Sequence, residues 1–556
     1  MFGAWVAVVA AATQPVAAVD VWLTRGDELS LLQQRPDVTF QPGTGSRSTK
    51  INLQPDTAYQ TIDGFGAAVT DSSAWLLQNK MSSSQRDALM QRLFTTAGDG
   101  IGLSYLRVPM GASDFALSPY TYNDLPAGQT DPTNTNFSIA HDEQYIIPTL
   151  QQARALNPQL RMMATPWSPP AWMKTSGQLN GGQLKPEFYD AYADYFVKFV
   201  QAYDAAGLPI DRVTVQNEPL NDSTGLPSAG MSTFQQSTFI GDHLGPAFAA
   251  AGIETGILAF DHNWEDWSYP VVVANDPEAG AVIAGAAFHG YAGTVDQQSN
   301  FHDFHPDLEV HYTEITGGDF APGFAGNLIY SIRNSIIGAT RNHAQTSLYW
   351  NIALDENRGP FLPGGCETCR GMVTIDSVTG DVTEEVEYYA YGHASKFVEP
   401  GAVRIGSDTI DGVIETVAFR NPDGTEVLIA LNPTNSSRWF DVVREEESFS
   451  YRLTSQSVAT FVWETALAAI DGDFDGDGFV SQSDLNLVLL NWGSATLPPG
   501  WTADEQFDGV AVSQNELNAV LLNWGNGEPP AIAIPEPAAA VFFGGGLITL
   551  RRNRNR

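Results

Sequence analysis

The chain has 556 residues, more than one ordinary domain needs, and its 43% hydrophobic and 11% aromatic residues can build large buried cores. Its 64 Asp and Glu residues against 28 Lys and Arg give a net charge of −36 at pH 7. A chain this acidic repels phosphate backbones, so a nucleic-acid partner is not expected.

The first segment, residues 1–18, is apolar, rich in small residues and ends in Val-Ala-Ala. This pattern predicts a signal peptide cleaved near Ala18 and therefore an exported protein. A buried first strand is the alternative that the same residues allow.

Three stretches with different patterns follow. Residues 20–56 contain short β-like runs, whereas residues 57–395 alternate apolar runs such as 161–165 with amphipathic helical stretches such as 188–203. Alternation of this kind predicts an α/β fold, a (β/α)8 TIM barrel. Residues 396–463 return to strands, and we expect them to pair with the first stretch in one side β-sandwich.

The C-terminal part contains an internal repeat. Residues 481–493 recur as residues 513–525 with ten of thirteen positions identical, and each copy predicts an amphipathic helix closed by Gly. Both copies lie in a predicted small helical module, residues 466–527. In residues 535–556, Pro-Glu-Pro precedes a thirteen-residue, largely apolar run and an Arg-rich end. That run is shorter than the roughly 20 residues that span a membrane.

The chain has two cysteines, Cys366 and Cys369. Two are too few for a zinc ribbon. A small loop disulfide and two free thiols are both open interpretations.

Two glutamates are the candidate catalytic residues. Glu218, in an Asn-Glu-Pro triplet, follows the strand-like run 212–216, and Glu314 follows the run 309–311. The C-terminal ends of strands form the catalytic face of a barrel, and the spacing fits a fourth and a seventh strand. Glycoside hydrolysis needs two carboxyl groups, because one protonates the leaving oxygen while the other attacks or stabilises an oxocarbenium-like centre.

Aromatic residues gather at the same predicted strand ends. Trp167, Trp350 and Tyr291, with the neighbouring His289, follow or end apolar runs. Trp and Tyr are also common core residues, but their shared position favours a pocket, because the C–H faces of sugar rings pack on aromatic faces.

Five motifs follow one another along the catalytic region: residues 60–71, 106–115, 165–172, 217–219 and 349–354. Together they resemble glycoside hydrolase family 30, and most of all its glucosylceramidase branch. The resemblance runs in unbroken order over residues 20–463. It implies a (β/α)8 barrel, a side β-sandwich built from both ends of the catalytic region, retention of anomeric configuration and no cofactor for catalysis.

The resemblance also implies roles for single residues. Glu218 corresponds to the acid/base, Glu314 to the nucleophile and Arg107 to the cation that keeps the nucleophile ionised. We expect the charge of Glu314 to raise the pKa of Glu218, so that Glu218 starts protonated. The implied sugar-contacting positions are Asp114, Trp167, Asn217, His289, Tyr291 and Trp350.

Two places depart from the family pattern. Gly290 stands where the animal lysosomal enzymes carry Trp, and the loop 363–371 differs from theirs. We expect Gly290 to open the pocket mouth to bulky β-glucosides, unless Trp264 or Trp267 fills the gap.

The repeat module has the spacing of an EF-hand calcium loop. Oxygen ligands stand at loop positions 1, 3, 5, 9 and 12, and Gly478 at position 6. The second loop, residues 505–516, puts Phe507 and Gly509 at ligand positions and is expected to bind poorly. The predicted Ca²⁺ ligands are Asp473, Asp475, Asp477, Ser481 and Asp484.

The duplicated loop and helix resemble a dockerin, which implies a cohesin-like or cell-surface partner. Residues 535–556 resemble a PEP-CTERM sorting signal, which implies an exported or cell-envelope protein. The sequence thus predicts a secreted retaining β-glycosidase of the glucosylceramidase or β-glucosidase type, acting on a β-glucoside or β-glucan. An endo-β-1,6-glucanase, a β-xylosidase and a non-catalytic carbohydrate-binding surface protein are the alternatives.

Overall fold

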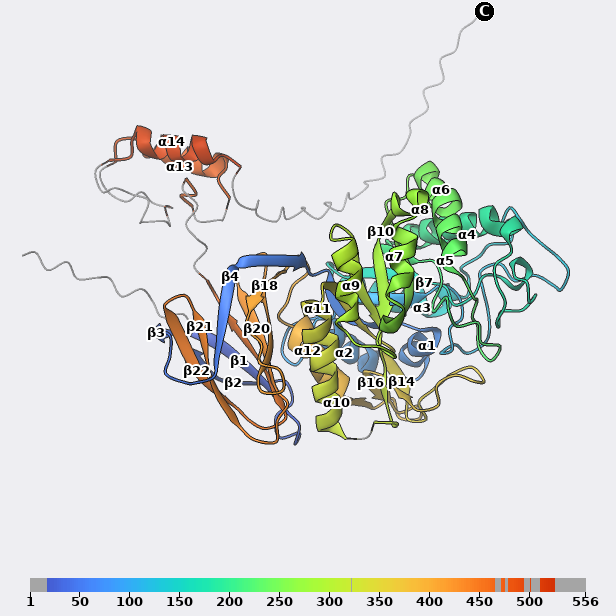
Figure 1. Ribbon diagram of the computed structural model, residues 1–556, viewed down its shortest axis with the longest axis horizontal. Helices are drawn as coiled ribbons and strands as arrows, with labels where there is room; N and C mark the ends of the chain where they lie inside the picture. Colours follow the sequence, from blue (N-terminus) through green and yellow to red (C-terminus); the bar gives the residue numbers. More distant parts are fainter. Residues whose placement is uncertain are drawn as a thin grey trace, which may run out of the picture. The chain divides into compact units, whose positions relative to one another are not determined.

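The computed structural model describes residues 18–321, 323–465, 472–475, 479–494, 501 and 511–525 (Figure 1). The chain divides after Thr465 into two compact units, which are described separately. Of the predicted signal peptide, only Ala18 lies among the described residues, and the predicted sorting tail lies outside them. Within the described residues, no helix is long and apolar enough to cross a membrane.

Eight parallel strands close into a barrel in the first unit. Strands that follow one another in the chain are neighbours, and the last strand pairs with the first. The predicted TIM barrel is therefore confirmed. The strands are β5 (Gly64–Ala68), β6 (Tyr105–Pro109), β7 (Arg161–Thr165), β8 (Arg212–Thr214), β9 (Gly256–Asn263), β10 (Ile283–His289), β11 (Glu309–Glu314) and β13 (Ala344–Tyr349).

Helices surround the barrel in Figure 1, and α4 (Tyr189–Ala205) illustrates why they form. Its buried side chains include Tyr192, Tyr195, Phe196 and Phe199, at the three- and four-residue spacing of one helix face. The other helices are α1 (Asp71–Asn79), α2 (Ser83–Phe94), α3 (Ile146–Leu156), α5 (Thr233–Thr238), α6 (Gly245–Ala251), α7 (Ser268–Ala274), α8 (Pro277–Gly280), α9 (Gln297–Phe304), α10 (Phe324–Tyr330), α11 (Ala339–Arg341) and α12 (Val386–Ser395).

A β-sandwich built from both ends of the first unit lies beside the barrel (Figure 1). One long strand, β4, passes between its two layers, because its first residues pair with β21 and its later residues with β18. Its strands are β1 (Ala18–Arg25), β2 (Gln33–Thr39), β3 (Gln41–Pro42), β4 (Lys50–Thr61), β18 (Val403–Ser407), β19 (Glu415–Arg420), β20 (Glu426–Asn432), β21 (Arg438–Arg444), β22 (Glu447–Leu453) and β23 (Ser457–Trp463).

The barrel helix α12 ties the two halves of the sandwich to the barrel. The ring nitrogens of its buried His393 lie 2.8 Å from the hydroxyls of Thr24 on β1 and Thr460 on β23. Burial lowers the pKa of His393 to about 3, so the imidazole is neutral at physiological pH.

The second unit contains two short helices from the repeat, α13 (Gln482–Leu490) and α14 (Gln514–Asn523). Each begins with a capping box: the Ser481 N–H donates to Asp484 and the Ser513 N–H to Glu516. Buried side chains join the two copies in one small core: Phe474, Val480, Val488, Trp501, Val512 and Val520.

Candidate active site

Glu218 and Glu314 meet at the C-terminal end of the barrel. Glu218 follows β8, the fourth strand, with a left-handed backbone (φ 46°), and Glu314 is the last residue of β11, the seventh strand. One carboxylate oxygen of each lies within 4.8 Å of the other. The structure therefore brings together the two carboxylates that the sequence singled out.

A buried arginine binds the Glu314 carboxylate. The Arg107 guanidinium on β6 donates to Glu314, and its Nη2 donates at 2.8 Å to both Asn217 and Asp261. The Tyr291 hydroxyl donates to the other Glu314 oxygen at 2.8 Å. Both carboxylate oxygens of Glu314 are therefore held in place by side-chain donors, one from β6 and one from the residues that follow β10.

His289 lies between carboxylates on both sides of its ring. Its Nδ1 is 3.2 Å from Glu218 and its Nε2 is 2.9 Å from Asp261. Burial alone would lower the pKa of His289, but the charges of Glu314 and Asp261 outweigh it and raise the pKa to about 9. At neutral pH both ring nitrogens therefore carry protons.

The predicted rise in the pKa of Glu218 is wrong for this structure. Burial raises that pKa, but the hydrogen bond and charge of His289, with smaller contributions from His262 and Asn221, lower it to about 2. With a pKa of about 2 for Glu218 and about 9 for His289, a protonated imidazole faces an ionised carboxylate at neutral pH.

Two tryptophans form one wall of the site. Trp167 and Trp350 stack with ring centroids 4.9 Å apart, and the Arg107 guanidinium lies over both rings. Both are at least nine-tenths buried and pack with Phe115 and Cys369. Tyr291, by contrast, exposes 42% of its surface.

Asp114 lies near the same carboxylates and is half-buried. Enclosure by the protein, followed by the charge of Glu314, raises the pKa of Asp114 to about 8. Asp114 is therefore largely protonated at neutral pH and can donate a hydrogen bond to a sugar hydroxyl as well as accept one.

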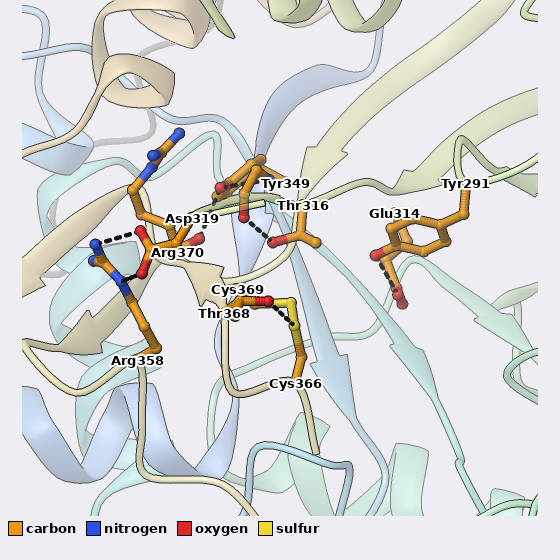
Figure 2. Close-up of a disulfide and its surroundings, with 11 residues drawn as sticks. Tyr291, Glu314, Thr316, Asp319, Tyr349, Arg358, Cys366, Thr368, Cys369 and Arg370 are labelled. Atoms are coloured by element: carbon orange, nitrogen blue, oxygen red, sulfur yellow. Dashed lines mark hydrogen bonds and ion pairs between the residues drawn. A yellow bond between two sulfur atoms is a disulfide. The ribbon is translucent and has the colours of Figure 1, made fainter. Parts of the chain in front are cut away.

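Cys366 and Cys369 form a disulfide in the loop that follows β14 (Ala353–Asp355), which answers the question that the sequence left open (Figure 2). Cys369 begins β15 (Cys369–Arg370), which pairs with β12 (Gly317–Gly318) a few residues after Glu314. The disulfide loop is thereby attached to the catalytic end of the barrel.

Gly290 has close neighbours in the direction that a side chain would take, and it also lines a cavity of about 450 Å³. A Cβ on Gly290 would lie 2.1 Å from the Tyr312 hydroxyl oxygen and 3.1 Å from the Trp264 ring. Trp264 is buried and stacks on Tyr312 with ring centroids 5.1 Å apart. Tyr312 and Trp264 together occupy the side-chain direction at Gly290, whereas the tolerance of bulky β-glucosides stays a prediction.

Asp261 on β9 is the residue that the sequence reasoning missed. It is fully buried and accepts hydrogen bonds from Arg107, Thr214 and Thr313, while its backbone carbonyl accepts from the Glu218 N–H at 2.9 Å. The available signal was an Asp that directly follows the apolar run 257–260 and precedes His262. Arg107 chiefly, and then His289, hold the pKa of Asp261 well below its usual range against the effect of burial.

In the second unit, three predicted calcium ligands lie together. Carboxylate oxygens of Asp473, Asp475 and Asp484 are within 4.8 Å of one another. Ser481 begins the adjacent helix, and Asp477 lies outside the described residues. Three close carboxylates repel each other, so the arrangement fits a hard cation such as Ca²⁺.

Comparison with known proteins agrees with this geometry. The model of the glycosyl hydrolase family 30 TIM-barrel domain matches residues 62–398, and that of the family 30 β-sandwich domain matches residues 401–461.

The relatives include endo-1,6-β-glucanases and glucosylceramidases. Endo-1,6-β-D-glucanase neg1 of Aspergillus fumigatus is 35% identical over 76% of this chain and 89% of its own. Lysosomal acid glucosylceramidase of Mus musculus is 31% identical over 74% of this chain and 83% of its own. Among solved structures, the endo-β1,6-glucanase BT3312 is 34% identical with a TM-score of 0.74, over 80% of this chain and 99% of its own.

A parallel barrel with two close carboxyl groups at its catalytic end is the arrangement of a glycoside hydrolase. The chain belongs to glycosyl hydrolase family 30.

Proposed function

We propose that the chain is an endo-β-1,6-glucanase that hydrolyses β-glucan with retention of anomeric configuration. The observation that carries the mechanism is the separation of Glu218 and Glu314, whose oxygens approach within 4.8 Å. Retaining enzymes hold their two carboxyl groups about 5–5.5 Å apart, whereas inverting enzymes leave about 6.5–9.5 Å for a water molecule. The relatives that carry the endo-1,6-β-glucanase name support the linkage.

The reaction runs in two displacements. Glu314 attacks the anomeric carbon while the bond to the leaving oxygen breaks, and Glu218 gives that oxygen the proton that it shares with His289. Water then attacks the glycosyl–Glu314 ester, and Glu218 accepts a proton from that water. Arg107 and Tyr291 stabilise Glu314 as it leaves in the second step.

The remaining predicted side chains bind the sugar in this proposal. The side-chain oxygen of Asn217 accepts a hydrogen bond from Arg107. The side-chain NH₂ group of Asn217 is therefore left to donate to a sugar hydroxyl. Trp167 and Trp350 give the apolar face of the ring a surface to pack on, and Asp114 binds a hydroxyl.

A glucosylceramidase or β-glucosidase activity, the type that the sequence analysis favoured, is the second candidate, and the resemblance to the mouse enzyme supports it. Analysis of the products from four substrates distinguishes the two candidate activities. The substrates are β-1,6-glucan, gentiobiose, an aryl β-xyloside and glucosylceramide. The proposal expects mixed oligosaccharides from β-1,6-glucan at the earliest times. Glucose alone, or cleavage of glucosylceramide with no attack on the polymer, would favour the second candidate.

We also propose that the protein is exported and that its second unit binds calcium and a docking partner. Asp473, Asp475, Asp477, Ser481 and Asp484 would supply the oxygen ligands of one Ca²⁺. Equivalent positions of the two helices leave large apolar side chains exposed, which supports a cohesin-like protein partner: Leu490, Trp492, Leu522 and Trp524. Pull-down by a purified cohesin, lost when both leucines are changed to Ser, tests the partner; equal capture of that variant would contradict it.

A further inference from the structure

We propose that a cavity beside Tyr291 is a second sugar site, which binds a glucosyl unit of the β-glucan chain adjoining the unit held between the two carboxylates. This inference rests on the proposed function, since it names where a polymeric substrate continues.

The cavity has a volume of about 450 Å³, within the range of about 300–1,000 Å³ that is typical of small-molecule sites. Residues that follow β10 and β11, Gly290 among them, form one side. Helices α10 and α12, Ser331 after α10 and Tyr349 at the end of β13 contribute the rest. Neither Glu218 nor either tryptophan of the site lines it. It is therefore a compartment separate from the space between the carboxylates.

Its walls carry exposed aromatic rings. Phe320 exposes 61% of its surface and Tyr330 43%, and both line the cavity with Tyr291. Large apolar groups left open around a concave surface are typical of a ligand site. Pyranose rings offer apolar C–H faces that pack on such rings.

The floor of the cavity supplies fixed polar groups. Glu387 is buried, and Arg370 Nη2 donates to it at 2.7 Å. The Tyr349 hydroxyl donates to the Arg370 carbonyl, and near it lies Thr316, seen between Tyr349 and Glu314 in Figure 2. A carboxylate at the floor disfavours an anionic ligand and accepts hydrogen bonds from hydroxyls, which suits a neutral sugar.

One side chain connects the cavity with the catalytic carboxylates. Tyr291 lines the cavity, and its hydroxyl donates to Glu314 at 2.8 Å. The next residue after Glu314, Ile315, also lines the cavity. In this proposal, a sugar chain that binds between the carboxylates passes Tyr291 to reach the cavity.

Gly326 gives a way to fill the cavity without disturbing the fold. It lies in α10 and lines the cavity, and a Cβ there would meet no atom within 4 Å. Leucine is also a better helix former than glycine. In Gly326→Leu we expect kcat/KM for β-1,6-linked gluco-oligosaccharides of four or more units to fall about tenfold, with hydrolysis of an aryl β-glucoside unchanged. Gly326→Ala is the matched control and should leave both substrates unaffected.

A second variant removes an aromatic side chain from the cavity wall instead of filling the cavity. Phe320→Ala should raise KM for the long oligosaccharides several-fold and leave kcat and the aryl glucoside rate unchanged. Phe304→Ala is its control, because Phe304 is equally exposed (62%) but ends α9 shortly before β11 begins, at the opposite face of the barrel.

The outcomes separate the two proposals. If the wild-type protein cleaves β-1,6-glucan and Gly326→Leu does so equally well, the cavity is not a sugar site. If the wild type cleaves a different β-glucan and Gly326→Leu loses activity on that polymer, the cavity proposal holds and the β-1,6 linkage is wrong. If no β-glucan is cleaved and the full chain binds none of the oligosaccharides in calorimetry, both are overturned.

Discussion

In the proposed mechanism, Glu218 and His289 share the proton for bond cleavage, and the pH dependence of the enzyme should report it. The pKa of His289 is about 9, above its ordinary value of 6.5, so the pair keeps this proton below pH 9 and loses it above. We therefore expect kcat/KM to fall as the pH rises through about 9.

Asp261→Asn tests this assignment. Loss of the Asp261 charge lowers the pKa of His289, so the alkaline decline in kcat/KM should move to lower pH. The variant should also be less stable by about 3–5 kcal/mol, because Arg107 loses a buried partner. Glu309→Gln, at the other end of β11, is the control and should leave the alkaline decline in place. An unmoved decline in Asp261→Asn would show that another group titrates.

Glu218→Ala should separate the two displacements. Loss of the acid is expected to slow substrates with poor leaving groups by about 10²–10⁴-fold and activated aryl glucosides much less. Added azide should then restore turnover and yield a β-glycosyl azide, because the anion attacks the glycosyl–Glu314 ester directly and, unlike water, needs no base. An α-azide would mean that the reaction inverts.

Gly290 and Gly326 form a contrasting pair of glycines. Gly290→Ala places a methyl group against the Tyr312 hydroxyl and the Trp264 ring, and overpacking of this kind costs about 1–3 kcal/mol. Gly326→Ala has open space and should be neutral or stabilising by up to about 1 kcal/mol. Chemical denaturation of the two variants gives both values; equal stabilities would show that Trp264 moves aside freely.

At the scale of elements, short apolar runs in the sequence predicted barrel strands, and a polar or charged residue at the end of a run marked the strand's C-terminal end. The run 161–165 has those bounds as β7, and Glu314 ends β11 as expected. Asp261 was missed because one carboxylate after an apolar run does not reveal that the barrel will bring Arg107 from β6 and His289 from β10 to it. The pKa of Glu218 was misjudged for the same reason, since it depends on a contact with His289 rather than on the motif.

The calcium loop can be tested in the full chain. The proposal expects one Ca²⁺ per chain in titration calorimetry, lost in Asp475→Asn because a ligand charge is removed from Asp473, Asp475 and Asp484. Glu516→Gln, which changes the capping-box glutamate of the second repeat, should leave the Ca²⁺ site of the first loop intact. Hydrolysis of an aryl β-glucoside should be the same with and without a chelator. Two equally tight sites would contradict the expected weakness of the loop at residues 505–516.

At the scale of the whole molecule, the barrel and the sandwich form one unit because both ends of the catalytic region meet on α12. His393 contacts β1 from one end of the catalytic region and β23 from the other. Detachment of either strand from α12 would expose a buried imidazole. The family resemblance of the sequence predicted this arrangement, whereas the disulfide that attaches the loop after β14 could be decided only from the fold.

The central claim is that two carboxylates within 4.8 Å act in sequence through a covalent glycosyl-enzyme. Trapping with a 2-deoxy-2-fluoro-β-glucoside that carries a good leaving group, followed by peptide mass spectrometry, tests it most directly. We predict one sugar bound per chain, on the peptide that contains Glu314, with activity lost in parallel. Active enzyme that stays unlabelled and releases the α-anomer first, or a label on the Glu218 peptide, would contradict it.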